Sequence, residues 1–379
     1  MTNEYLDLAA AVRAQTGKSI AVQMREILRL RKLKQQLGVS DYYLFRLYDE
    51  QHLRDCEARD FIGWKLNEAY SAALNPRTEV LPAWDKLTFK SIADSFGLPA
   101  LPIVATYRDC EYLAPSVFGH HLKTKDELLV FLRDPDNYPL FCKPSFSQQG
   151  IGAYRIESYR ADDDTIEHFG GEPEPAGDFA ERVAGQDSRR FVKHNRGYLF
   201  QRPAAQHPEI TAFTGYPVLS SVRVVCLNDG GDAFVQNALW KCALPPNHTD
   251  NFSKGKTGNL VADVDVSNGR LYDAMNALWP YGEWVTEQPS TGRKFRDFHL
   301  PDWDRIVEIC MQGAKAISGM GVLHWDIAMT DSGPQIMELN DIGGIEGLQI
   351  GGRGMLAGRA RQFFKDHGDR SRHPWINQL

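Results

Sequence analysis

The sequence predicts an α+β fold in which helices and antiparallel hairpins are mixed. Turn sequences separate neighbouring apolar runs at Asn228–Gly231 and at Ser267–Gly269, and such short connections join antiparallel strands. Helical periodicity appears elsewhere, as in the apolar stripe from Trp303 to Ile317, which Asp302 is expected to cap. Because helices do not alternate with single strands, a parallel βαβ arrangement is not expected.

Composition bounds the class of protein. The 379 residues exceed what one core usually serves, so two or three structural units are expected. The net charge of −6 argues against a general nucleic-acid binder, which would carry a basic excess. No run approaches the roughly 20 apolar residues of a membrane span, and the N-terminus lacks the regions of a signal peptide. The six cysteines are scattered without a Cys-x-x-Cys pair, so a cytoplasmic protein with reduced thiols is predicted.

Residues 1–80 are predicted to form a helical region. The segment Ile20–Leu37 has helical apolar spacing interleaved with arginines and lysines, and Gly38 is expected to end that helix. We interpret the basic residues as a solvated helix face. Contact with acidic lipid or another polyanion is the alternative.

A second helix is predicted from Asp85 to Phe96, with Phe96 on its buried face. Lys86 and Lys90 lie one turn apart on it, where like charges repel slightly. A nearby phosphate would relieve that repulsion. Lysines that serve only solubility are the equal alternative.

A strand that ends in Lys143 precedes a polar loop with glycines and then a second strand, Ala153–Ile156. This pattern predicts a hairpin with a flexible tip, in which the lysine and backbone amides neutralise and cover a polyphosphate. Neither G-x-x-x-x-G-K-[ST] nor G-x-G-x-x-G occurs. The polar segment that begins at residue 159 is expected to be an exposed connection, followed by a short helix at Asp178–Val183.

Two strands are predicted around the turn Asp331–Pro334. Side chains two apart on a strand share a face, so Glu338 and Asn340 point the same way, and symmetric pairing brings Asp326 opposite them. Two carboxylates and an amide oxygen suit Mg²⁺ bound together with phosphates. Their apolar neighbours favour a metal site over a structural polar network, because burying carboxylates without a cation is costly.

Four further features are candidates for chemistry. Arg223 alternates with valines and either directs its guanidinium at a phosphoryl oxygen or lies on the outer surface, and Lys241 on the adjoining strand is open to the same interpretations. His324 shares a face with Asp326 and either stabilises developing negative charge or supports its neighbours by hydrogen bonds. The glycines at 343–344 either allow close approach to a substrate or form a plain turn.

Taken in order, these motifs resemble those of the ATP-grasp superfamily, most closely its sugar-transfer-associated branch. The resemblance runs from about Leu81 to Leu356. The motifs that carry it are the helix with its following turn, Asp85–Pro99; Phe141–Ser145 with Gly150 and Gly152; Leu199–Pro203; Ser221–Val225; and Asp326, Glu338 and Asn340 with the glycines after them.

The resemblance implies two α+β lobes, residues 81–200 and 201–379, that hold ATP between them. Gln201 departs from the acidic residue that the family often has at this position. The implied roles are ATP binding by Lys90, Lys143, Ser145, Gly150, Gly152, Gln201 and Pro203, Mg²⁺ binding by Asp326, Glu338 and Asn340, and catalysis by Arg223, Lys241 and His324.

The implied reaction is phosphoryl transfer from ATP to a small carboxylate, followed by attack of an amine that yields an amide, ADP and phosphate. Biosynthesis of a polysaccharide or natural product is an expected setting. The alternatives are a phosphotransferase that acts on a hydroxyl or carboxylate group and a nucleotide-binding protein without turnover. The sequence contains neither G-x-S-x-G nor H-E-x-x-H, which agrees with catalysis by positioning and charge neutralisation.

Overall fold

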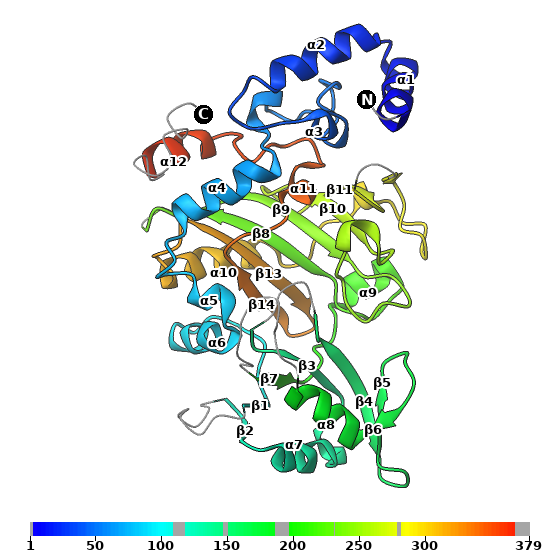
Figure 1. The fold of residues 1–379 in the computed structure, drawn as a ribbon, viewed down its shortest axis with the longest axis vertical. Coiled ribbons are helices and arrows are strands. Elements are labelled where there is room, and N and C mark those ends of the chain that lie inside the picture. The colour runs from blue at the N-terminus through cyan, green and yellow to red at the C-terminus, as the bar shows by residue number, and fades with distance from the viewer. Residues whose placement is uncertain are drawn as a thin grey trace.

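The computed structural model of the protein describes residues 3–108, 118–146, 151–185, 197–230, 232–278 and 282–367. Within these residues, two seven-stranded sheets follow one another along the long axis, and the N-terminal helices lie beyond the second sheet (Figure 1). Helices and antiparallel strand pairs are mixed, which confirms the predicted α+β fold.

The N-terminal region is helical, as predicted. Tyr42, Phe45 and Phe61 form the centre of its own apolar core, which shows that this region packs as a unit. Its elements are α1 (Asn3–Thr16), α2 (Ile20–Leu30), α3 (Val39–Leu44), η1 (Ala58–Asp60) and α4 (Trp64–Leu74).

The prediction of one helix over Ile20–Leu37 is wrong in its second half. The helix α2 ends at Leu30, and Gly38 precedes α3, where its N–H donates to Asp41 Oδ2 at 2.7 Å. The chain leaves the helix because Gln35 turns inward and its Nε2 donates to a carbonyl of η1 at 3.0 Å. A tertiary hydrogen bond therefore overrides local helical spacing here.

The first sheet has the strand order β2-β1-β7-β3-β4-β5-β6. The pair β1 and β2 is parallel, and the other neighbours are antiparallel. The helices α7 (Lys125–Leu132) and α8 (Ala176–Gly185) pack on it, and η2 (Pro135–Asn137) precedes β3. Its strands are β1 (Ala105–Tyr107), β2 (His120–Leu122), β3 (Leu140–Pro144), β4 (Tyr154–Arg160), β5 (Thr165–His168), β6 (Glu174–Pro175) and β7 (Tyr198–Gln201).

The segment after residue 159 is not the exposed connection that was expected, because it contains β5 and β6. Ile166 is fully buried in the core of this sheet. A single apolar residue among polar neighbours thus anchors the hairpin, which explains why composition alone suggested a loop. The short helix expected at Asp178–Val183 is confirmed within α8.

The second sheet has the strand order β12-β11-β10-β9-β8-β13-β14 and is antiparallel throughout. The hairpins between β8 and β9 and between β10 and β11, both predicted from turn sequences, are confirmed. Its strands are β8 (Ser221–Leu227), β9 (Phe234–Cys242), β10 (Leu260–Val264), β11 (Leu271–Met275), β12 (Trp284–Val285), β13 (Val322–Thr330) and β14 (Gly333–Asn340).

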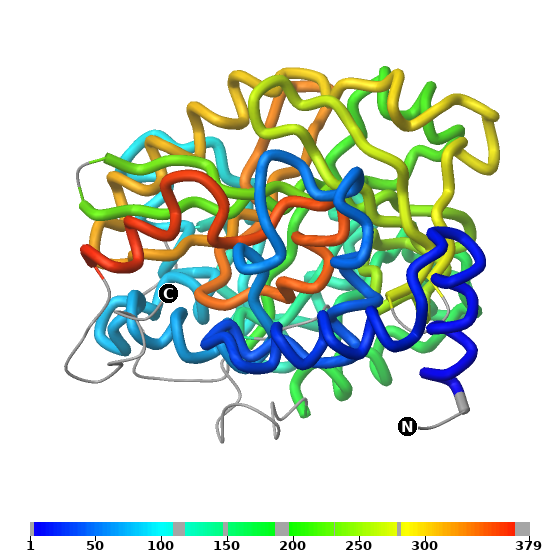
Figure 2. The backbone as a smooth tube through the Cα atoms, turned by 90° about the horizontal axis from the view of Figure 1, so that it is seen from above, coloured from blue at the N-terminus to red at the C-terminus, as the bar shows by residue number. Residues whose placement is uncertain are grey.

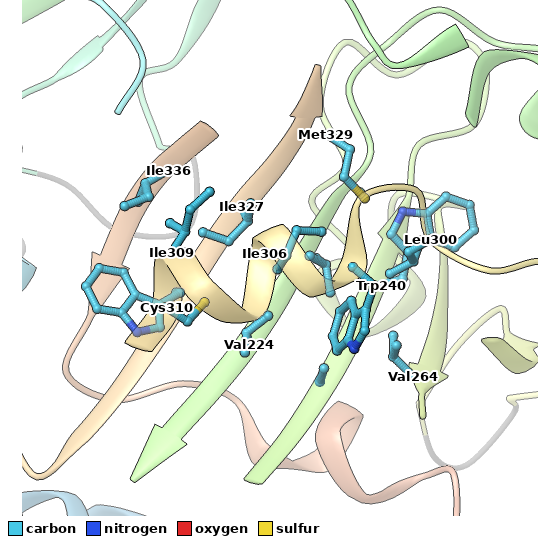
Figure 3. Packing of buried hydrophobic residues seen from close by; sticks show 14 of the residues in the cluster. Val224, Trp240, Val264, Leu300, Ile306, Ile309, Cys310, Ile327, Met329 and Ile336 are labelled. Atoms are coloured by element: carbon cyan, nitrogen blue, oxygen red, sulfur yellow. The ribbon is translucent and has the colours of Figure 1, made fainter. Parts of the chain in front are cut away.

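One face of the second sheet forms the main core. Ile306, Ile309 and Cys310 of α10 (Trp303–Ala316) point at side chains such as Trp240 and Ile327 (Figure 3). The helices α5 (Leu81–Trp84), α6 (Lys86–Ser95) and α9 (Pro208–Thr214) also contribute to this core, and η3 (Ser253–Gly255) and η4 (Phe295–Asp297) lie in the connections.

Two local predictions about these helices are wrong. Phe96 is 64% exposed, because α6 ends at Ser95 and the chain turns before Phe96 reaches the buried face. Asp302 precedes α10 in the left-handed region (φ 55°), and its side chain makes no capping hydrogen bond.

The opposite face of the second sheet is apolar at one end and polar at the other. The apolar end is covered by α4, α11 (Ile345–Gln349) and α12 (Ala360–His367). The chain between α2 and α4 crosses above this end (Figure 2), where Arg54 Nε donates to Gly351 O at 2.6 Å and Ile62 N donates to Gln349 Oε1 at 3.0 Å. The N-terminal region therefore holds the segment that follows β14 in place. The polar end of the same sheet face lies toward the first sheet.

No helix in the described part of the chain is long and apolar enough to cross a bilayer. The described cysteines carry free thiols. Cys110 lies outside the described residues.

Candidate active site

Three strands of the second sheet bring charged residues together at its polar end. Asp326 on β13 is paired in register with Arg223 on β8 and with Glu338 on β14. The predicted hairpin pairing is therefore confirmed, with an irregularity between Asp326 and Ile327. Side chains paired in register share a face, so the three charged groups lie side by side.

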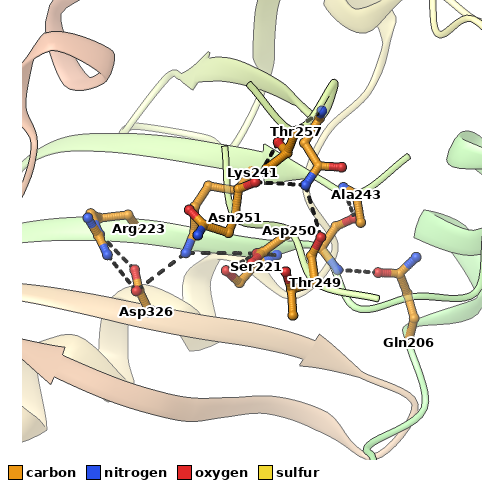
Figure 4. A network of polar contacts seen from close by, with 12 residues as sticks. Gln206, Ser221, Arg223, Lys241, Ala243, Thr249, Asp250, Asn251, Thr257 and Asp326 are labelled. Carbon is orange, nitrogen blue, oxygen red and sulfur yellow. Dashed lines mark hydrogen bonds and ion pairs between the residues drawn. The ribbon is translucent and has the colours of Figure 1, made fainter. Parts of the chain in front are cut away.

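Arg223 and Asp326 form a two-point ion pair. The guanidinium Nε lies 2.8 Å from Asp326 Oδ1, and Nη2 lies 2.6 Å from Oδ2. Lys241 Nζ approaches the same Oδ2 at 3.3 Å (Figure 4). Burial would raise the pKa of Asp326, but the charges of Arg223 and Lys241 outweigh it and hold that pKa well below its usual range.

This pairing changes the argument for a metal at Asp326. The carboxylate of Asp326 is only 3% exposed, and a buried carboxylate needs a cation. Arg223 and Lys241 already supply that cation from within the protein. The burial of Asp326 is therefore no longer evidence for a bound metal.

Asp250 is a site residue that the sequence analysis did not select. Its Oδ2 accepts from Ser221 N at 2.8 Å and from Ser221 Oγ, and lies 3.8 Å from Lys241 Nζ (Figure 4). Lys241 is thus held between Asp250 and Asp326. The segment from Thr249 to Phe252 is part of the resemblance to the family, but the contacts of Asp250 with Ser221 and Lys241 follow only from the fold.

Lysines from the first sheet and from α6 complete the charged cluster. Burial lowers the pKa of Lys143, and Glu338 and Asp326 partly counteract that shift. Burial likewise lowers the pKa of Lys86 to about 8, with Glu338 opposing the shift and Lys143 adding to it. These two lysines therefore lie within electrostatic reach of Glu338.

Lys86 is the α6 lysine within electrostatic reach of Glu338, whereas the predicted Lys90 lines the smaller pocket. The backbone N–H of Lys86 donates to Ser145 O at 3.1 Å, which ties the start of α6 to the end of β3. Lys90 Nζ instead forms an ion pair with Asp94 and lies 5.4 Å from the ring of Phe118.

A pocket of about 590 Å³ opens beside the cluster, between the two sheets. A smaller pocket of about 240 Å³ shares Leu101, Lys143, Gln201 and Met337 with it and extends to Lys86 and Lys90. The larger pocket is lined by Leu101, Phe141, Lys143, Arg155, Gln201, Arg202, Pro203, Ala204, Val218, Leu219, His248, Thr249, Asp250 and Met337.

Most of the predicted ATP-binding residues border these pockets. Gln201 is buried, its Nε2 donates to Leu101 O at 3.3 Å, and its Oε1 has no hydrogen-bond partner among the described residues. Ser145 N donates to Gly197 O at 2.9 Å, which fixes the start of the glycine loop.

Of the two loop glycines, Gly152 adopts a positive φ of 75°, and its carbonyl accepts from Tyr198 OH at 3.0 Å. Gly150 lies outside the described residues.

His324 is fully buried on β13, two residues before Asp326. Burial, with Arg223 nearby, lowers its pKa to about 3, so the imidazole is neutral. Neither ring nitrogen has a hydrogen-bond partner among the described residues, and the same is true of Nδ2 of Asn340, the register partner of His324. A Cβ atom added to Gly343 would lie 2.5 Å from His324 Nδ1, so only glycine fits there.

Helix α4 supplies polar residues that the sequence analysis missed. Asn67 Nδ2 donates to Gly343 O at 2.9 Å, and Asn75 Nδ2 donates to Val322 O at 2.8 Å. Ser71 lies between them at the spacing of one helical turn, and its buried Oγ has no partner in the described part of the chain. The recurrence of Asn, Ser and Asn every four residues along an apolar helix face was the sequence signal that could have identified these polar residues.

The predicted metal ligands fit a hard cation in type. Among the described residues, no group of three His, Cys, Asp or Glu side chains is arranged to hold a metal. Two carboxylates and the Asn340 amide nevertheless form an oxygen donor set of the kind that binds Mg²⁺ together with phosphates. Glu338 is half-buried and forms no ion pair within the described residues, which makes it the carboxylate free to take a ligand.

The fold places a cluster of charged side chains and a pocket between two sheets. The sequence matches the family described as sugar-transfer-associated ATP-grasp over residues 65–365. The chain therefore belongs to this family, as the resemblance predicted. No curated protein matches it.

Solved structures that resemble the chain are remote. An L-amino acid ligase from Bacillus licheniformis is 14% identical, with a TM-score of 0.37 over 75% of this chain and 47% of that chain. VanG D-Ala:D-Ser ligase from Enterococcus faecalis is 14% identical, with a TM-score of 0.38 over 76% and 60%. A biotin carboxylase from Campylobacter jejuni is 12% identical, with a TM-score of 0.41 over 75% and 49%. The chain thus spans roughly half the length of such structures, and similarity at this level carries no functional argument.

Proposed function

We propose that the protein is an ATP-dependent ligase that joins a small carboxylate to an amine through an acyl phosphate. The observation that carries this proposal is the convergence of Lys86, Lys143, Arg223 and Lys241 around Asp326 and Glu338, beside a pocket between two sheets. Such a density of cations is expected where several phosphate oxygens must be held.

The nucleoside end of ATP is assigned to the larger pocket. Its walls include the apolar side chains of Phe141, Leu101 and Met337, which suit the faces of an adenine ring. The unpaired Oε1 of Gln201 offers an acceptor to an exocyclic amino group. The phosphates then extend past Lys143, which lines both pockets, toward Lys86 and Glu338.

The chemical step needs charge neutralisation more than a protein nucleophile. A carboxylate oxygen of the acid attacks the γ-phosphorus, the bond to the β-phosphate oxygen breaks, and ADP leaves. Arg223 retains N–H groups beyond those bonded to Asp326, and these are free to hold the transferring oxygens. When bound, Mg²⁺ would neutralise phosphate charge and would be held by Glu338 and Asn340, with Asp326 sharing its oxygens between the ion and Arg223.

The acceptor end is assigned to His324 and Gly343. An amine attacks the acyl carbon, the carbonyl oxygen becomes negative, and phosphate departs as the amide forms. His324 is neutral and fully buried, so its part at this end is to position Gly343, against which it packs, rather than to supply charge. Asn67 of α4 holds the segment against which His324 rests, through its hydrogen bond to Gly343 O.

The test is a screen for ADP release with amino acids, amino sugars and uronic acids as paired substrates, followed by mass spectrometry of the product. A product lighter than its two substrates together by one water, with orthophosphate released, supports the ligase. A phosphorylated product without orthophosphate supports the phosphotransferase alternative instead. Glu338→Ala should abolish the ADP release while Glu209→Ala, on the exposed end of α9, leaves it unchanged. Unchanged ADP release by Glu338→Ala contradicts the metal assignment.

A further inference from the structure

The outer face of α2 carries cations and leucine together. Arg25, Leu28 and Arg29 lie at the i, i+3, i+4 spacing that places side chains on one side of a helix, and Lys32 follows two residues beyond the end of α2 at Leu30. All four are exposed, and Leu28 is 54% exposed. A single exposed leucine is ordinary on a protein surface, so Leu28 carries weight only together with the cations around it and with a second exposed leucine nearby.

The turn after α2 is also basic and exposed. Arg31 and Lys34 are exposed there, and Leu33 is 36% exposed between them. The basic-leucine face is therefore defined by Arg25, Leu28, Arg29, Arg31, Lys32, Leu33 and Lys34.

This face is not neutralised by the rest of the protein. None of its five cations forms an ion pair or a side-chain hydrogen bond within the described residues. Glu26 is the sole acidic residue between Ser19 and Ser40 in the sequence. It points inward, where its carboxylate accepts from Lys18 Nζ at 2.8 Å and from Tyr42 OH at 2.5 Å.

The position of the face suits contact with an extended surface. The helix α2 lies at one end of the long axis, and the first sheet lies at the other (Figure 1). The opposite side of α2 is fixed to the N-terminal core through Gln23, Ile27 and Leu30. The face is therefore presented on a preformed helix, on a chain whose net charge is −6.

We propose that the basic-leucine face binds the surface of an anionic lipid bilayer. The cations would contact lipid phosphates, and Leu28 and Leu33 would enter the boundary between headgroups and acyl chains. A nucleic-acid backbone would use the cations and leave the two leucines in water. The alternation of both kinds of side chain on one face favours lipid, and the proposal is independent of the reaction catalysed at the active site.

The test is sedimentation of the full chain with vesicles of phosphatidylcholine alone or mixed with phosphatidylglycerol. The wild type should sediment with the mixed vesicles only, and added salt should weaken binding. Arg25→Glu/Arg29→Glu/Lys32→Glu should weaken partitioning by about a hundredfold, since each cation near an anionic surface contributes roughly fivefold. Leu28→Ser/Leu33→Ser should weaken it by about tenfold through lost insertion.

A matched control variant separates the effect of losing this face from the effect of changing the net charge of the protein. Arg293→Glu/Lys294→Glu/Lys315→Glu makes the same charge change at exposed cations elsewhere, and it should bind mixed vesicles within about twofold of the wild type. Thermal unfolding midpoints establish that each variant is folded. The proposal is overturned if the wild type ignores anionic vesicles or if the control loses as much as the α2 variant. It is also overturned if the leucine variant binds like the wild type, because the face is then a general polyanion site.

Discussion

Arg223 and Asp326 lie opposite one another on β8 and β13, and the guanidinium binds both carboxylate oxygens at 2.8 Å and 2.6 Å. This pair, with Lys241 3.3 Å from the same carboxylate, fixes the centre of the candidate site. It also means that the protein itself provides the countercharge for a carboxylate that sequence reasoning assigned to a metal. Asp326 therefore orients Arg223.

Removing Arg223 should destabilise the fold. In Arg223→Ala, Asp326 keeps only Lys241 as a cationic partner, so the free energy of unfolding should fall by about 3 kcal/mol. Urea denaturation measures this change. Arg296→Ala is the matched control, because its ion pair with Asp273 is exposed on the arginine side (62%) and should contribute less than about 1 kcal/mol. Equal losses of unfolding free energy in the two variants would show that the Arg223–Asp326 pair stabilises the fold no more than an exposed ion pair does.

The lysine cluster makes a prediction about nucleotide affinity. Lys86→Ala and Lys143→Ala should each weaken ATP binding by at least about tenfold, because both lysines lie near Glu338 and line the pockets. Lys90→Ala should change affinity by less than about threefold, since its ammonium is paired with Asp94. Isothermal titration with ATP measures the three dissociation constants. A loss in Lys90→Ala as large as in Lys86→Ala would restore the original assignment of the α6 lysine.

The two glycines after β14 should respond differently to alanine. In Gly343→Ala the new methyl group would lie 2.5 Å from His324 Nδ1, so His324 or the turn must move. In Gly344→Ala its nearest neighbour is Glu346 Oε2 at 3.6 Å, an ordinary contact. ADP release should therefore fall by at least about tenfold in Gly343→Ala, as expected when an active-site group is displaced, and stay near the wild-type rate in Gly344→Ala. Equal rates in both variants would remove the argument for close packing on His324.

Burial of His324 predicts a pH dependence of stability. Its pKa in the fold is about 3, below the ordinary value of 6.5. Between these values the unfolded chain takes up a proton that the folded chain does not, so stability is complete above pH 6.5 and is lost as the pH falls toward 3. From pH 7 to pH 5, the wild type should lose about 2 kcal/mol more than His324→Gln. Urea denaturation at both pH values checks this. Equal losses of stability in the wild type and in His324→Gln would mean that folding does not lower the pKa of His324.

Several elements follow from local sequence for clear physical reasons. The turn Asp331–Pro334 fixes the register of β13 and β14, so the opposition of Asp326 and Glu338 was predictable. The apolar spacing of α10 and the cap of α6 by Asp85 are likewise local.

Other features depend on contacts between distant segments. The Arg223–Asp326 pair requires β8 to lie beside β13, which no local pattern specifies. The contribution of α4 requires Asn67 to meet Gly343 from the other end of the chain. The end of α2 is decided by the tertiary hydrogen bond of Gln35.

The central claim is that the carboxylate substrate becomes an acyl phosphate before the amine attacks. Its most direct test uses the acid identified in the screen, labelled with ¹⁸O in both carboxylate oxygens. Transfer of one carboxylate oxygen to the γ-phosphoryl group, followed by loss of phosphate, should release orthophosphate that carries one ¹⁸O atom, as mass spectrometry would record. Orthophosphate without ¹⁸O, released together with the product, would contradict the claim.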